Sequence, residues 1–126
     1  RALSQDPDND SLKKEMKHIL VMESVKTKGN TYFGQRKLED ALIFYDEALQ
    51  LDPYNNMWKA VLCSNKASCY MGLKNTSKAL DLMKESTNFD PNNAKNMYKR
   101  GKLEKDMKNW DKALYYFSYI NKSYIN

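Results

Sequence analysis

The sequence is poor in helix-breaking residues, and it has no apolar run of about 18 residues or more. Four glycines and three prolines in 126 residues leave few places for the tight turns of β-hairpins. A membrane-spanning helix needs about 20 predominantly apolar residues, so we expect no span and no membrane partner. Positions 1–10 are polar and acidic, unlike a secretory signal peptide. We therefore predict one all-α domain.

Cysteine and histidine are also scarce. Cys63 and Cys69 are six residues apart, a spacing that fits neither a CxxC motif nor a zinc pair. We expect both thiols to be buried and reduced, which favours a reducing compartment, most simply the cytoplasm. His18 has no Ser or Cys nucleophile in a suggestive setting, and we expect an ordinary helix residue there. The sequence thus predicts no enzyme, no metal site and no cofactor.

Positive charge is in excess, and most of it is lysine. The chain has 18 Lys and 3 Arg, with a formal net charge of +5. A basic chain can bind nucleic acid, an anionic membrane or an acidic peptide. Which of these ligands it binds depends on where in the fold the charge lies.

Similar segments recur along the chain. Asp-Pro-Tyr-Asn at 52–55 is echoed by Asp-Pro-Asn-Asn at 90–93 and by Asp-Pro-Asp-Asn at 6–9. Matching amphipathic runs, 38 and then 34 residues apart, begin at Ala41, Ala79 and Ala113. A period near 34 residues with two helical runs per unit is typical of tetratricopeptide repeats.

Small and aromatic residues resemble that repeat family position by position. The matching residues are Gly29, Tyr32, Ala41, Tyr45, Ala48, Pro53, Ala67, Tyr70, Ala79, Pro91, Gly101, Ala113 and Phe117. Met83 and Ser86 depart from the usual aromatic and Ala, and Glu104 stands where Tyr is usual. The resemblance implies a three-repeat domain over residues 22–126, an α-solenoid superhelix of antiparallel helix pairs whose aromatic positions form the core.

The start of the chain interrupts the repeat. Residues 1–9 resemble the end of an upstream repeat, so we expect the chain to come from a longer array. We expect a helical spacer at 10–21, capped by Asp10 or Ser11 and continuing as one helix to about residue 35. Four extra residues around 56–59 should lengthen the next helix by about one turn.

The end of the chain offers no capping helix after the last pair. Solenoids usually need such a cap to cover their terminal repeat. We therefore expect some aromatic surface in the last helix to be exposed or to lie in a contact between chains, at Trp110, Tyr116 and Tyr119. The sequence itself does not indicate an oligomeric state.

The charge alternates between helices. In tetratricopeptide arrays the first helix of each pair lines the concave groove, and we predict these helices at 22–36, 57–72 and 94–108. They carry eleven cations and three anions, a net charge of +8. The second helices, over 38–51, 76–88 and 110–124, carry four cations and seven anions, a net charge of −3. A merely solvated face would not produce this alternation, so the groove is predicted to be basic.

Five polar residues of the predicted groove resemble the carboxylate clamp of chaperone-binding tetratricopeptide domains: Lys26, Asn30, Asn65, Lys95 and Lys99. The first four of these residues, Lys26, Asn30, Asn65 and Lys95, match the family's residue types, and four such matches at set positions arise by chance about once in 5,000. The resemblance implies that these residues bind the terminal carboxylates of Asp-ended tails on heat shock protein 90 or heat shock protein 70. The family usually has Arg where Lys99 stands. Lys keeps the charge without the bidentate fork, so Lys99→Arg should hold or improve affinity.

The order of segments resembles the second repeat block of DnaJ-type co-chaperones. Immunophilins and the Hop-type adaptor share the clamp and remain alternatives. Two further hypotheses are a scaffold whose groove binds an internal peptide, and a basic groove that binds nucleic acid, which we do not favour. The sequence does not decide which chaperone class is preferred.

Overall fold

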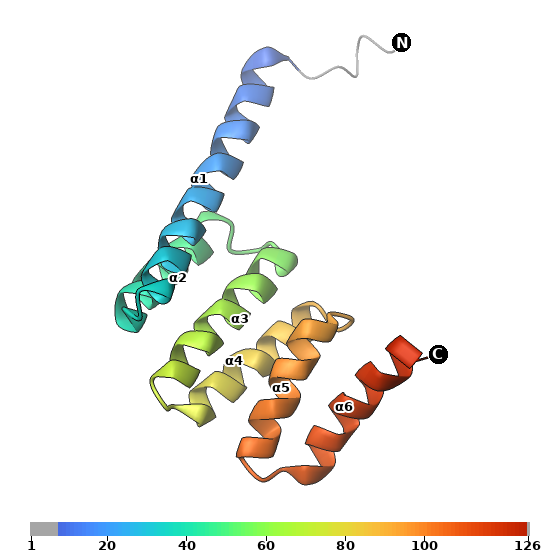
Figure 1. The fold of residues 1–126 in the computed structure, drawn as a ribbon. Coiled ribbons are helices and arrows are strands. Elements are labelled where there is room, and N and C mark those ends of the chain that lie inside the picture. Colours follow the sequence, from blue (N-terminus) through green and yellow to red (C-terminus); the bar gives the residue numbers. More distant parts are fainter. Residues whose placement is uncertain (1–7, 126) are drawn as a thin grey trace, which may run out of the picture.

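The computed structural model describes residues 8–125, with side chains to residue 122. Within these residues it contains no strand and six helices: α1 (Asn9–Gly34), α2 (Leu38–Leu51), α3 (Asn56–Gly72), α4 (Thr76–Phe89), α5 (Ala94–Asp106) and α6 (Trp110–Ile125). Figure 1 shows three antiparallel pairs, each packed on the next. The all-α superhelix is confirmed. Most of the predicted upstream repeat, at 1–7, lies outside the described residues.

Helix α1 begins earlier than predicted. Its N-cap is Asp8, whose carboxylate accepts a hydrogen bond from the Ser11 backbone N–H at 2.7 Å, so the prediction of Asp10 or Ser11 was wrong. The helix then continues without interruption to Gly34, as expected. Its first turns extend beyond the packed pairs (Figure 1), and the side chains of residues 8–21 are exposed. The division into a spacer at 10–21 and a repeat domain from 22 stays a prediction.

Asparagine side chains cap the N-termini of three of the later helices. The side chains of Asn55, Asn75 and Asn93 accept hydrogen bonds from backbone N–H groups three residues ahead, at 3.0, 3.2 and 3.1 Å. These bonds satisfy donors that a helix leaves free at its start. Helix α3 has 17 residues against 13 in α5, which confirms the predicted extra turn.

The helices of a pair cross at small residues. A Cβ atom added at Gly29 would lie 2.5 Å from a ring carbon of Tyr45, and one at Gly101 would lie 2.6 Å from Phe117. Ala67 is fully buried at the same place in the second pair. Glycine or alanine is therefore needed for the close approach of the two helices within a pair.

Two of the residues that depart from the family pattern, Ser86 and Glu104, are buried with polar partners. The Ser86 hydroxyl donates to the Ala60 carbonyl at 2.7 Å and accepts from Asn96 Nδ2 at 3.1 Å, and it thereby links α3, α4 and α5. The Glu104 carboxylate is 0% exposed and accepts from Asn109 Nδ2 at 2.9 Å and from Arg100 Nε at 3.5 Å. The departures therefore add polar contacts between neighbouring elements.

The last helix leaves aromatic surface uncovered, as predicted. Trp110 is 61% exposed and Tyr119 is 41% exposed. Tyr116 is partly buried beneath the Arg100 guanidinium, which lies 4.6 Å from the ring centroid. No helix within residues 8–125 is long and apolar enough to cross a bilayer.

The two thiols and the histidine lie where we expected them. Cys63 and Cys69 are free and buried, and burial raises the pKa of each to about 11. His18 is exposed on the projecting part of α1. The cysteines are therefore core residues of α3 with little thiolate at neutral pH.

Candidate functional site

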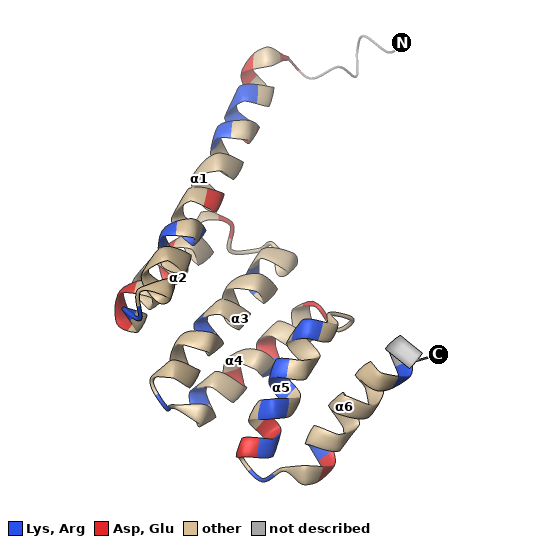
Figure 2. Ribbon diagram, viewed as in Figure 1, with Lys and Arg blue, Asp and Glu red and all other residues tan. Residues whose placement is uncertain are grey.

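Among the described residues, most of the positive charge on the groove side is not paired with an acidic side chain. Figure 2 shows Lys and Arg along α1, α3 and α5. In the part of the chain that the structure describes, ion pairs engage three of the groove cations, Lys26, Lys66 and Arg100. The other groove cations can attract an anionic ligand, and little internal charge offsets them.

Lys26, the first predicted site residue, lies on α1 and has two neighbours. Its Nζ is 3.1 Å from Glu23 Oε1, three residues earlier in the helix. The same nitrogen lies 5.5 Å from the ring centroid of Trp58, at the start of α3. A ligand carboxylate would therefore compete with Glu23 for this ammonium.

Asn30, one turn further along α1, is fixed by a tyrosine. Its amide oxygen accepts a hydrogen bond from the Tyr45 hydroxyl at 2.6 Å. Burial, followed by the nearby Cys69, raises the pKa of Tyr45 to about 12, so the phenol keeps its proton and acts as donor. With the oxygen occupied, the Asn30 NH₂ group is the part of the amide left to bind an anion.

The other three predicted residues come together. Asn65 on α3 and Lys95 and Lys99 on α5 line one small hollow of about 190 Å³. Val61, Ser64, Asn93 and Asn96 complete its lining. Every polar side chain around this hollow can donate a hydrogen bond, which suits it to a carboxylate.

Lys99 lies deeper than Lys95 and is held by α3. Its Nζ donates to the hydroxyl oxygens of Ser64 and Ser68, both at 2.8 Å, and to the Ser64 carbonyl at 3.1 Å. Burial, and then the charge of Lys95, lower the pKa of Lys99 to about 8. Arg100 turns away to Thr87 on α4, at 2.7 Å, and so does not substitute for Lys99.

A larger hollow of about 540 Å³ adjoins the small one, because Lys95 and Lys99 line both. Its apolar wall comes from Phe33, Met71 and Tyr98. Its remaining lining residues include Ser68 and further cations, at Arg36, Lys74 and Lys102. These two adjoining hollows, together called the basic trough, are lined by residues at the end of α1 and on α3 and α5.

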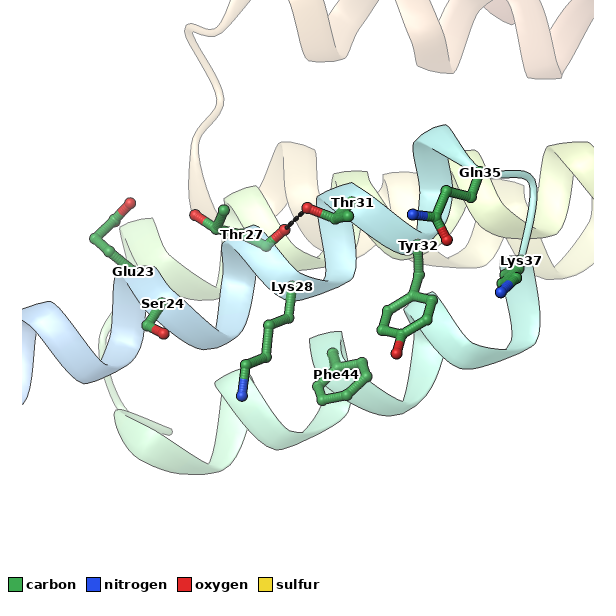
Figure 3. Close-up of a pocket in the computed structure, with 9 residues that line it drawn as sticks. All are labelled: Glu23, Ser24, Thr27, Lys28, Thr31, Tyr32, Gln35, Lys37 and Phe44. Atoms are coloured by element: carbon green, nitrogen blue, oxygen red, sulfur yellow. Dashed lines mark hydrogen bonds between the residues drawn. The ribbon is translucent and has the colours of Figure 1, made fainter.

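Another hollow, of about 690 Å³, lies elsewhere, on α1 and α2 (Figure 3). Tyr32 and Phe44 stack there at 5.2 Å between ring centroids, and Thr31 bonds the Thr27 carbonyl. None of the five predicted residues lines it. It is separate from the proposed clamp.

The structure thus gathers three of the five residues in one hollow, while Lys26 and Asn30 line neither of the hollows that hold the others. Whether all five bind one ligand stays a prediction. Sequence reasoning did not find Ser64 and Ser68. Their one signal is two hydroxyl residues four positions apart on a groove helix, beside Asn65.

A family model described as tetratricopeptide repeat matches residues 24–55, and a second with the same description matches residues 60–93. Together the matches cover just over half of the chain. The chain belongs to the tetratricopeptide repeat family. This agrees with the period, the helix pairs and the close crossings described above.

Among curated proteins, a DnaJ homolog subfamily C member 7 homolog of Schizosaccharomyces pombe is 33% identical over 113 residues, which are 90% of this chain and 24% of that protein. Hsp70-Hsp90 organizing protein 3 of Arabidopsis thaliana is 30% identical over 112 residues, 85% of this chain and 19% of that protein. The chain therefore spans a quarter or less of the length of these relatives.

Among solved structures, the first tetratricopeptide domain of Spaghetti (RPAP3), bound to the HSP90 peptide SRMEEVD, superposes with a TM-score of 0.71. It is 27% identical and covers 80% of this chain and 77% of that one. The fold described here is thus the same as that of a tetratricopeptide domain with a peptide in place.

Proposed function

We propose that this chain is a co-chaperone module that binds the acidic, Asp-ended C-terminal tail of heat shock protein 90 or heat shock protein 70. The observation that carries the proposal is the hollow in which Asn65, Lys95 and Lys99 meet. The chemistry there fits a chain end, because a terminal Asp presents two carboxylates to a hollow that holds one amide donor and two positive charges. Similarity to a tetratricopeptide domain bound to SRMEEVD supports it.

Lys26 and Asn30 complete the clamp in this proposal. Both lie on a groove helix one turn apart, and the NH₂ of Asn30 is the end that Tyr45 leaves free. The apolar wall of the larger hollow would contact a residue before the chain end. Reduced, buried cysteines accord with a cytoplasmic setting. The module binds a protein, and no residue is assigned a catalytic role.

Titration calorimetry tests the proposal with the peptide SRMEEVD and the same peptide with an amidated C-terminus. We expect a Kd of order micromolar, about −8 kcal/mol, for the free acid. The amide should bind at least about tenfold more weakly, because it loses the terminal charge. Equal affinity for both peptides would refute a clamp and favour a groove for internal segments.

A tail peptide of heat shock protein 70 with the same terminal residue decides between the chaperone classes. The variant Lys95→Ala removes a cation of the proposed clamp and should weaken binding of both tail peptides. Its matched control is Lys105→Ala, because Lys105 is an exposed cation on α5 that lines neither hollow of the trough. This control should leave the affinities for both peptides unchanged. If Lys105→Ala weakens binding as much as Lys95→Ala does, general charge attraction explains the affinity and the clamp does not.

A further inference from the structure

Lys99 Nζ is surrounded by uncharged oxygen acceptors and forms no ion pair with an Asp or Glu of the described residues. Three acceptors from Ser64 and Ser68 lie within 3.1 Å of its Nζ, one for each N–H of an ammonium group. Ser64 and Ser68 are one turn apart on α3, so both hydroxyls face α5 from the same side of the helix. With all three protons engaged, this ammonium has no N–H left for a ligand.

The serine hydroxyls do have protons to donate. A hydroxyl accepts through its lone pairs and still carries one O–H donor. The Ser68 O–H finds only the Ser64 carbonyl at 3.4 Å, which is a long bond. A hydroxyl that accepts from an ammonium is polarised, and its own O–H becomes a stronger donor.

The two hydroxyls serve different hollows. Ser64 lines the small hollow with Asn65, and Ser68 lines the larger one with Arg36 and Lys74. Lys99 borders both. No Asp or Glu among the described residues lines either hollow. The arrangement therefore offers one polarised O–H donor to each of two neighbouring anion sites.

We propose that Ser64 and Ser68 are ligand-binding residues whose hydroxyls, held and polarised by Lys99, donate to two different carboxylates of the ligand. The ligand class is a peptide with a terminal carboxylate, for the small hollow, and an acidic side chain upstream, for the larger one. This assignment rests on the proposed function. In this assignment Lys99 is a positioning residue, which holds and polarises the two serine hydroxyls but does not itself bond the ligand.

The three oxygen acceptors around Lys99 Nζ, which we call the cradle, also determine which cation fits at position 99. An ammonium directs three N–H groups from one nitrogen, which matches three acceptors around one point. A guanidinium is planar and spreads its donors over three nitrogens, so it fits this cluster poorly. On this proposal Lys99→Arg should weaken binding, which is the opposite of the expectation from the family pattern.

The first experiment needs no peptide. The ¹³Cε shift of Lys99 is followed by NMR against pH in the free protein, where the parent midpoint should lie near 8. The charged or titratable groups around it are Lys95, Tyr98 and Lys102 on α5, Cys69 on α3, and Arg36 and Lys74 just after the ends of α1 and α3. The double variant Ser64→Ala/Ser68→Ala should lower the midpoint, because acceptors stabilise the ammonium. Ser118→Ala, at an exposed serine on α6, is the control.

The second experiment measures peptide affinity in a double-mutant cycle. Ser68→Ala should weaken SRMEEVD about threefold to tenfold, the value of one hydrogen bond. It should have no effect in a Lys99→Met background, where the hydroxyl is no longer polarised. Ser68→Ala should also have no effect on a peptide whose upstream acids are replaced by Gln, while Ser64→Ala should still weaken that peptide.

The outcomes separate the two proposals. An unchanged NMR midpoint in the double serine variant, or equal losses in the parent and Lys99→Met backgrounds, would overturn the cradle. Tighter binding by Lys99→Arg would do the same. Failure of the parent to bind any Asp-ended peptide would overturn the proposed function, and the NMR midpoint would still decide whether the serines hold Lys99.

Discussion

The groove has two polar pairs with the same one-turn spacing and different surroundings. On α1, Lys26 has a carboxylate beside it, and the amide of Asn30 is fixed by a tyrosine. On α5, Lys95 is exposed and Lys99 sits in neutral oxygen acceptors. The α1 pair is thus partly neutralised and oriented within the protein, while the α5 pair carries charge that only a ligand can offset. The α5 side should therefore dominate affinity, and the α1 side should adjust it.

The largest effect is expected at Lys95. Lys95→Ala should cost about 1.5–3 kcal/mol of binding to SRMEEVD, because it removes a charge-assisted bond. The fold should be unaffected, since the side chain is exposed. Calorimetry measures the loss and a melting curve checks the fold. Lys26→Ala is the comparison, with a smaller expected cost because Glu23 already competes for that ammonium. Parent-like binding by Lys95→Ala would show that the groove recognises something other than a carboxylate.

The next effect is a pH dependence that arises from the α5 side. The pKa of Lys99 is lowered to about 8 in the free protein, and a bound carboxylate would raise it again. Affinity should be highest below pH 8 and fall by up to about tenfold per pH unit above it, as the free protein loses the proton that the complex retains. Calorimetry from pH 7 to about 9.5 measures this. Lys99→Met should flatten the profile, and a slope that persists in this variant would assign the titration to another group.

A smaller effect is expected where Tyr45 orients Asn30. Tyr45→Phe removes the bond at 2.6 Å and keeps the buried ring that packs on Gly29. It should weaken both folding and binding by about 0.5–1.5 kcal/mol each, because the amide can then rotate. The control is Tyr32→Phe, at a partly buried ring that stacks on Phe44. If binding is unchanged in Tyr45→Phe, the orientation of Asn30 does not matter to the ligand.

The helical repeat was predictable because its signals are local and periodic. Alanine spacing, glycine at the crossings and aromatic positions each follow from packing of one helix on the next. The N-cap at Asp8 was missed because several acidic and hydroxyl residues follow one another there, and any of them can accept from a backbone N–H. The sequence therefore predicts the first residue of a helix less precisely than it predicts which face of the helix is buried.

Individual residues of the candidate site were predictable from the sequence, but the contacts between them were not. Family resemblance pointed to Lys99 but gave no indication that Ser64 and Ser68 hold it, since those contacts span 31 to 35 positions in sequence. The same holds for Tyr45 and Asn30, 15 positions apart. Such contacts depend on the distance between α3 and α5, or between α1 and α2, which the helix-packing residues set.

The smallest effect is expected at Glu23, whose removal tests whether the polar pair on α1 is weakened by the carboxylate beside it. Glu23→Gln removes the carboxylate beside Lys26 and should strengthen binding to SRMEEVD by about 0.2–0.5 kcal/mol, the usual value of an exposed pair within one helix. Glu39→Gln, at an exposed position of α2, changes the net charge equally and is the matched control. The gain should vanish in about 1 M salt, where charges are screened within about 3 Å. An equal gain in Glu39→Gln would mean that net charge alone governs affinity, and the difference between the α1 and α5 sides of the groove would then have no role in recognition.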